Sequence, residues 1–185
     1  MTTRPFAGAL AGLSTESRAL LLDQGKPMTV PRGEWLLREG QICRSIFYIE
    51  QGLVRSYRIE NGRDINLDFS FEGDFVTHLR SLRSHLVADY ALQAMERASV
   101  IELTGSALQT LYQQSPEIAA FGRQLVEGKL MQQESHAHFF RLHTPAERYR
   151  YLADQHPEML RRVSLTNLAS FLGMSRETLS RIRGK

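Results

Sequence analysis

The pattern of apolar and polar residues along the chain changes near residue 105. Before this point, short segments alternate apolar and polar residues and are separated by glycines. After it, apolar residues recur every three or four positions. Alternation is typical of half-buried strands, and the longer spacing is typical of amphipathic helices. We therefore predict a β domain over residues 1–115, a long helix over residues 116–143 and a smaller helical domain over residues 144–185.

One hairpin stands out in the first part. Asn61 and Gly62 both adopt positive φ at little cost, which suits the tight turn between two antiparallel strands. The strand after this turn is expected to place its apolar residues on one face and its polar residues on the other. The apolar set is Ile65, Leu67, Phe69 and Phe71, and the polar set is Asn66, Asp68 and Ser70.

Further short strands are predicted on both sides of this hairpin. The segment "RGEWLLREGQICRSIFYIEQG" contains two apolar stretches bounded by Gly33, Gly40 and Gly52. The segment "YALQAMERASVIEL" contains two more around a polar turn. Short strands spaced about ten residues apart, with glycines between them, favour a small β-sandwich or barrel.

The long helix is expected to start at Pro116, with Ser115 as its N-cap. Its apolar positions share a heptad seam that Gly128, Gln132 and Ser135 interrupt. The seam residues are Ile118, Phe121, Leu125, Phe139 and Leu142. Such a seam suits a dimerisation helix that packs partly against another domain. The alternative is a helix that covers the barrel of its own chain.

A further helix is predicted after Thr144-Pro145, ending before Pro157, and two short helices follow it. Ser164 is a plausible N-cap for the first of these two, with Val163 and Leu168 as a hydrophobic staple. Gly173 is placed to end it, because a left-handed residue there carries no steric penalty.

The last helix is expected to begin at Ser175 and to pack Leu179 and Ile182 against the helix before it. Its outer face then carries polar side chains that can contact bases and phosphates. The candidate DNA-binding residues are Ser175, Arg176, Glu177, Ser180, Arg181 and Arg183. Two helices joined by a tight turn in this way have the outline of a helix-turn-helix. The alternative is a solvated helical hairpin that only completes the fold.

Composition adds little to this picture but excludes some classes of protein and some kinds of site. The 185 residues include 23 Lys and Arg against 20 Asp and Glu, a net charge of +3 that permits a polyanionic partner. Cys43 is the single cysteine, which excludes an internal disulfide framework, and we expect it to be an inert thiol. No metal site is predicted, since His136 and His138 point about 200° apart on a helix. The apolar stretch at residues 6–13 is too short for a membrane span, so we expect a cytoplasmic protein without membrane contacts.

The segment "LTNLASFLGMSRETLSRIR" resembles the helix-turn-helix of the CRP/FNR family of bacterial transcription regulators, and "GEWLLREGQICRSIFYIEQGLVRSYRIENGRDINLDFSFEGDFV" resembles that family's cyclic-nucleotide-binding-like jelly roll. The resemblance implies an α+β fold with an N-terminal β jelly-roll sensor domain, a long dimerisation helix and a C-terminal helix-turn-helix. It implies a homodimer that binds double-stranded DNA at an inverted repeat, with RNA polymerase as a further partner and no enzymatic activity. It also implies that Arg176, Glu177 and Arg181 contact bases or phosphates.

The chain departs from the cyclic-nucleotide binders of that family after "GDF". Those proteins carry Gly-Glu and then Arg-Ser or Arg-Thr, where this chain has Thr77-His78 and Ala88-Asp89. An anionic phosphate would lose its cation and meet a carboxylate, so we predict that cAMP and cGMP do not bind in the family manner. Arg80 or Arg83 would have to supply a substitute cation. The candidate residues for another, unidentified effector are Gly73, Asp74, Phe75, His78 and Asp89.

The sequence printed here ends at Lys185, four residues after Arg181, whereas longer family members continue with a β-hairpin wing. We therefore expect weaker and strongly salt-dependent DNA binding. The sequence leaves two alternative functions open. One is an effector-binding or protein-interaction module that does not read DNA. The other is a cupin-like enzyme in which His78 and Asp74 would form an acid-base pair.

Overall fold

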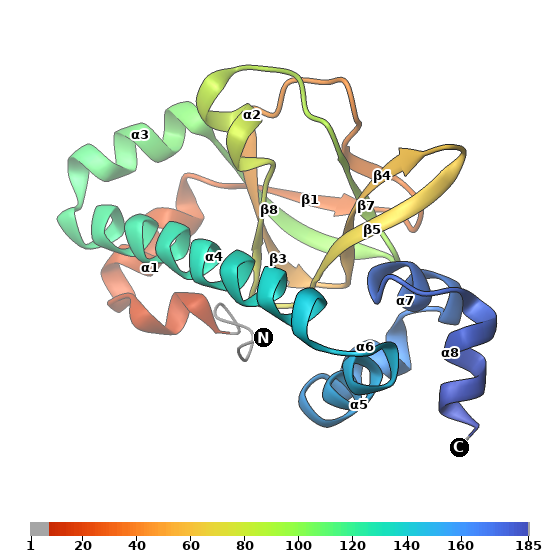
Figure 1. The fold of residues 1–185 in the computed structure, drawn as a ribbon. Helices are drawn as coiled ribbons and strands as arrows, with labels where there is room; N and C mark the ends of the chain where they lie inside the picture. The colour runs from red at the N-terminus through yellow and green to blue at the C-terminus, as the bar shows by residue number, and fades with distance from the viewer. Residues whose placement is uncertain (1–7, 185) are drawn as a thin grey trace.

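A computed structural model describes residues 8–184 and contains two four-stranded antiparallel sheets (Figure 1). One sheet has the order β1-β8-β3-β6, from β1 (Lys26–Val30), β8 (Ala98–Thr104), β3 (Ser45–Gln51) and β6 (Phe75–Val76). The other has the order β2-β7-β4-β5, from β2 (Trp35–Leu37), β7 (Ala91–Ala94), β4 (Val54–Glu60) and β5 (Arg63–Ser70). This arrangement confirms the predicted β jelly roll.

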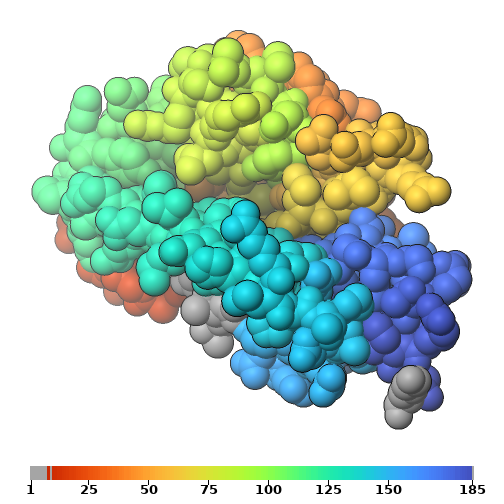
Figure 2. Space-filling model, viewed as in Figure 1, coloured from red at the N-terminus to blue at the C-terminus, as the bar shows by residue number. Residues whose placement is uncertain are grey.

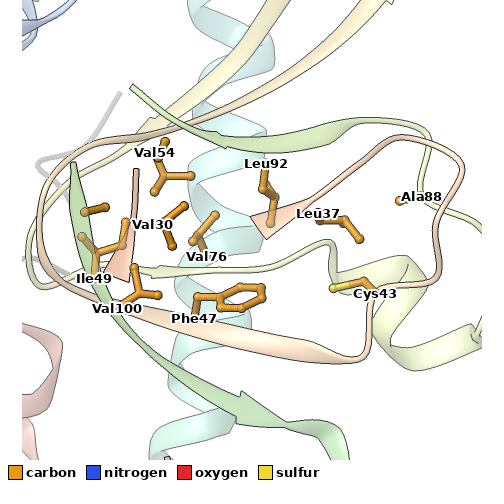
Figure 3. Close-up of a cluster of buried hydrophobic side chains, with 12 residues drawn as sticks. Val30, Leu37, Cys43, Phe47, Ile49, Val54, Val76, Ala88, Leu92 and Val100 are labelled. Atoms are coloured by element: carbon orange, nitrogen blue, oxygen red, sulfur yellow. The ribbon is translucent and has the colours of Figure 1, made fainter. Parts of the chain in front are cut away.

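The space between the two sheets is filled by apolar side chains. Figure 3 shows these side chains pointing toward one another from strands of both sheets. The cluster consists of Val30, Leu37, Cys43, Phe47, Ile49, Val54, Val76, Ala88, Leu92, Ala94, Ala98 and Val100. Burying them supplies the hydrophobic free energy that holds the two sheets together.

The strand β5 does not keep the strict alternation that its sequence predicts. A register shift interrupts its pairing with β4, where Ser56 lies opposite Asp68 but Tyr57 lies opposite Asn66. The expected outward-facing Asn66 is only 4% exposed, because a C-terminal helix covers it. A bulge of this kind changes which side chains share a face, so the alternation prediction was wrong at this position.

Helices cover one side of the barrel. The 3-10 helix η1 (Ala9–Gly12) and α1 (Thr15–Asp23) precede β1, α2 (Leu79–Ser84) follows β6, and α3 (Gly105–Gln114) leads into α4 (Pro116–Leu142). Ser115 caps α4 as predicted, since its hydroxyl accepts a hydrogen bond from the Ile118 backbone at 3.2 Å. Ile118 and Phe121 are buried against α1 and α3. The first part of the predicted seam therefore packs on the protein's own barrel.

Four more helices complete the chain: α5 (Pro145–Gln155), α6 (Pro157–Arg162), α7 (Leu165–Phe171) and α8 (Arg176–Arg183). Their sequence signals place the starts of α5, α7 and α8 correctly, whereas α6 was not predicted. Figure 2 shows these helices, in blue, as a lobe beside the green and yellow barrel. The α+β fold class is thus confirmed. Within residues 8–184, no helix combines the length and hydropathy that a bilayer crossing requires.

Candidate nucleic-acid interface

The turn between α7 and α8 is built from local backbone hydrogen bonds. The Gly173 N–H donates to the Ser170 carbonyl at 3.1 Å, and the Met174 N–H donates to the Ala169 carbonyl at 3.0 Å. This pair of bonds is the Schellman arrangement, in which the first residue past the helix is left-handed. Gly173 has φ +66°, so its lack of a side chain is needed there. The predicted helix-turn-helix outline is present.

The helix α8 is oriented by one buried residue and one cap. Leu179 is fully buried among residues of α7 and α6, while the Ser175 hydroxyl accepts a hydrogen bond from the Thr178 backbone at 3.2 Å. The opposite side of the helix faces solvent. All six candidate DNA-binding residues are exposed: Ser175, Arg176, Glu177, Ser180, Arg181 and Arg183.

The polar groups of α8 are partly organised before any ligand binds. Arg181 donates to the Thr178 hydroxyl at 3.3 Å, and the Thr178 and Ser175 hydroxyls are 3.1 Å apart. Hydrogen bonds from the first helical turn, first its own backbone N–H and then the Ser175 side chain, lower the pKa of Glu177. Glu177 is therefore an anion that can accept a hydrogen bond, and it lies among arginines that can donate them.

Arg148 fixes the position of this helical unit. Its guanidinium donates to three backbone carbonyls, those of His143 at 3.0 Å, Leu172 at 3.0 Å and Phe140 at 2.7 Å. These carbonyls belong to the end of α4 and to the end of α7, where helix carbonyls lack partners in their own helix. Arg148 therefore joins α5 to the ends of two other helices.

An apolar contact and an ion-pair network hold the helical lobe against the barrel. Phe171 of α7 packs on Phe69 of β5 with ring centroids 5.4 Å apart. Arg162 at the end of α6 forms two hydrogen bonds with Glu72, at 2.8 and 2.7 Å, and one with Glu96 at 2.5 Å. The hydrogen bonds from Arg162 are the main reason that the pKa of Glu72 falls from 4.5 to about 2.

Backbone and side-chain hydrogen bonds add to this contact between α7 and β5. The Ser170 hydroxyl donates to the Asp64 carbonyl at 2.7 Å and accepts from the Asn66 backbone at 3.0 Å. The Asn66 side chain donates to the Asn167 carbonyl at 3.4 Å. The first helix of the helix-turn-helix therefore lies against the β4–β5 hairpin, and α8 lies outside it (Figure 1).

The helix α4 carries an exposed apolar stripe that the predicted seam did not include. Val126, Leu130 and Met131 are 48%, 70% and 63% exposed, and Leu142, a seam residue, is 76% exposed. Within the described residues, this helix holds the largest group of exposed aliphatic side chains on one element. The spacing of Val126 and Leu130 is the i, i+4 signal from which the stripe could have been found.

At the other end of the molecule, His78 and Asp89 form a pair across the loop that contains α2. The His78 Nδ1 accepts from the Ser81 backbone at 3.2 Å, and its Nε2 lies 2.7 Å from the Asp89 carboxylate and 3.3 Å from the Asp89 backbone nitrogen. The hydrogen bond from His78 lowers the pKa of Asp89. Tyr90 stacks on the His78 ring at 4.0 Å. Arg80 also pairs with Asp89, at 3.2 Å.

The other effector candidates lie in different surroundings. Asp74 accepts a hydrogen bond from the Phe71 backbone at 2.8 Å within the turn before β6, and Gly73 has φ +83° in the same turn. Phe75 packs between Tyr48 and Phe121, with centroids 5.0 and 5.9 Å away. His78 is paired with Asp89 and not with Asp74, so the acid-base pair considered for an enzyme is not formed.

Two remaining sequence questions concern Cys43 and metal ions. Cys43 is 1% exposed in the barrel core, with its sulfur 3.2 Å from the Ser45 carbonyl. Among residues 8–184, no group of three His, Cys, Asp or Glu side chains is close enough to hold a metal ion.

Two positioning residues, Arg148 and Arg162, were missed by the sequence analysis. Nothing in the local pattern separates them from exposed arginines, because their partners lie in other elements. Glu72 is 90 positions from Arg162, for example. Only the folded arrangement identifies such contacts.

Comparison with known proteins finds one matching domain family and several solved structures with a similar fold. Residues 27–115 match the cyclic nucleotide-binding domain family. No curated protein matches the chain. Among solved structures, the c-di-GMP-responsive global regulator CLP of Xanthomonas campestris is similar with a TM-score of 0.75 and 21% identity, over 92% of this chain and 90% of that one.

Two further similar structures span most of their own chains. FixK2 from Bradyrhizobium japonicum has a TM-score of 0.71 and 23% identity, over 86% of this chain and 83% of that one. The catabolite activator protein of Thermus thermophilus has a TM-score of 0.63 and 20% identity, over 96% of this chain and 85% of that one. Residues 27–115 therefore match the cyclic nucleotide-binding domain family, and most of the chain shares its fold with these three solved structures.

Proposed function

We propose that this protein is a DNA-binding transcription regulator that acts as a homodimer on an inverted-repeat operator. The observation that carries the proposal is the exposed polar face of α8. The Ser175 cap and the buried Leu179 fix the orientation of this helix. Arg181 can form two hydrogen bonds with a guanine, and Glu177 can accept one from a cytosine. The similar structures named above include transcription regulators, which agrees with this chemistry.

The exposed stripe of Val126, Leu130 and Met131 on α4 supports the homodimer. A second copy of α4 packed on this stripe would remove these side chains from water, which favours association. Two-fold symmetry would then place two copies of α8 about 34 Å apart, one turn of DNA. An inverted repeat with half-sites at that spacing follows.

We further propose that cAMP does not control the protein in the usual way. Ala88, at the position of the phosphate-binding arginine, is 1% exposed within the barrel core. His78 and Asp89 are already paired with each other, so neither is available to a cyclic phosphate without breaking that pair. Isothermal titration is expected to detect no micromolar cAMP site. A single such site in the barrel would overturn this part of the proposal.

The DNA-binding proposal is tested by selecting duplexes from a randomised pool with the wild-type protein. The selected duplex and a scrambled one are then compared by fluorescence anisotropy, with Arg181→Ala and the control Arg83→Ala. Loss of one base contact costs about 1–3 kcal/mol and a dimer loses two, so Arg181→Ala should lose at least about 30-fold in affinity for the selected duplex. Failure to enrich any sequence, or equal binding of wild type and Arg181→Ala to the selected and scrambled duplexes, would instead favour a protein-interaction module.

A further inference from the structure

A groove of about 600 Å³ separates α5 from α8. Its floor is apolar, formed by Ala146 and Tyr149 of α5 and by Ile182 of α8. Three arginines also line it: Arg150 from α5, and Arg181 and Arg183 from α8. Neither Tyr149 nor Arg150 is part of the helix-turn-helix, and Arg150 was not among the DNA-binding candidates.

Three arginines border the groove, and most of the surface that lines it is apolar. Within the described part of the chain, no carboxylate lines it. The nearest acid along α5, Glu147, is held in the cap of that helix by the Thr144 backbone and hydroxyl, both at 2.8 Å. The Thr144 hydrogen bonds are the main cause of the lowered pKa of the Glu147 carboxyl, to which Arg150 already contributes. Three neighbouring guanidinium groups attract an anion. Arginine is particularly suited to phosphate, because its planar fork matches two phosphate oxygens.

Arg150 is free to make such a contact, unlike its neighbour on the same helix. Arg148 uses its donors on three backbone carbonyls, whereas Arg150 is exposed and has no hydrogen bond or ion pair with any residue in 8–184. An exposed arginine with an unpaired guanidinium on a basic groove can bind an anion without breaking a structural contact.

The groove is continuous with the DNA-reading face of α8, since Arg181 and Arg183 belong to both. A helix that enters the major groove has a sugar-phosphate backbone on each side, and about half or more of protein–DNA hydrogen bonds go to that backbone. We propose that the α5–α8 groove receives this backbone, with Arg150 as a phosphate-binding residue outside the helix-turn-helix. This inference rests on the proposed DNA-binding function.

The test is the salt dependence of binding by full-length Arg150→Gln. Arg83→Gln, the same change on α2 at the far end of the barrel (Figure 1), is the matched control. Wild type and both variants are titrated by anisotropy onto a scrambled and a selected duplex between 50 and 200 mM salt. Each lost phosphate contact reduces the slope of log K against log salt by about 0.9, so a dimer loses about 1.8. Over this fourfold range, wild type should therefore lose about 12-fold more affinity than Arg150→Gln.

The ratio of selected to scrambled affinity is expected to stay the same in Arg150→Gln, because phosphates carry no sequence information. An unchanged slope on both duplexes would overturn the inference. Stabilisation of wild type, but not of Arg150→Gln, by millimolar pyrophosphate with no change in slope would mark a small-anion site instead. Equal binding of wild type to both duplexes would refute sequence-specific binding. A smaller salt slope for Arg150→Gln on the scrambled duplex would still confirm the phosphate contact at the groove. Absence of any DNA binding by wild type would refute both.

Discussion

The ion-pair network between α6 and the barrel gives the most quantitative prediction. In the variant Arg162→Gln, Glu72 and Glu96 lose the guanidinium that donates to both. The fall in the pKa of Glu72 from 4.5 to about 2 would correspond to about 3–4 kcal/mol, at about 1.4 kcal/mol for each pKa unit. The Glu72 side chain is 39% exposed, however, and solvent screening reduces this value. We therefore expect the variant to lose about 1–2 kcal/mol of the free energy of unfolding at pH 7.

The pH dependence of this loss distinguishes the ion pair from simple packing. The folded-state pKa of Glu72 lies below its unfolded value, so the stabilisation is complete above about pH 5 and disappears as the pH falls toward 2. The difference in stability between wild type and Arg162→Gln should therefore shrink to less than half of its neutral value by pH 3.

Urea unfolding at pH 7 and pH 3 measures both quantities. Arg161→Gln is the control, because it removes the neighbouring, exposed arginine and the same charge. We expect Arg161→Gln to unfold within about 0.5 kcal/mol of wild type at both pH values. The reasoning is refuted if Arg162→Gln has the same free energy of unfolding as wild type at pH 7. It is also refuted if the difference between them stays constant down to pH 3.

Two further predictions concern the turn and the proposed dimer. Gly173→Ala places a side chain at φ +66° and should cost about 1–2 kcal/mol, lowering Tm by about 2–8 °C in a circular-dichroism melt. Gly12→Ala, where the added methyl meets open space, is the control, and an equal Tm for both variants would contradict the strain argument. Leu130→Glu should convert a dimer to a monomer in sedimentation experiments, because it places a charge on the exposed stripe of α4. Leu86→Glu, a change at another exposed leucine, outside α4, should leave the oligomeric state as in wild type, and a dimeric Leu130→Glu would exclude this stripe as the interface.

Local signals in the sequence were sufficient for much of this fold. Ser115, Ser164 and Ser175 cap the helices that they were predicted to cap, and Gly173 ends α7 in the predicted left-handed conformation. These signals are reliable because a cap or a positive φ depends on residues within one helical turn. The exposed face of α8 follows from the same local periodicity.

Interactions between distant elements were not predictable in this way. The alternation expected for β5 failed at Asn66, because a register shift and the contact with α7 bury that side chain. The pairing of His78 with Asp89 depends on how the loop around α2 closes, whereas the sequence had suggested only Asp74 as an acid-base partner of His78. The predicted seam of α4 is not one continuous exposed surface, because Ile118 and Phe121 are buried against α1 and α3. In each case a tertiary contact decided which of several locally acceptable arrangements forms.

The three carbonyls bound by Arg148 restrict where this molecule can bend. A simple hinge would lie between α4 and α5, but Arg148 spans that junction through Phe140 and His143 and also reaches Leu172 at the end of α7. Rotation at the junction would break several charge-assisted hydrogen bonds at once. The end of α4, α5 and α7 should therefore move as a single rigid body. A conformational change that reorients α8 must then open the contact between α7 and the β4–β5 hairpin, which makes the barrel surface around Asn66 the place where such a movement is controlled.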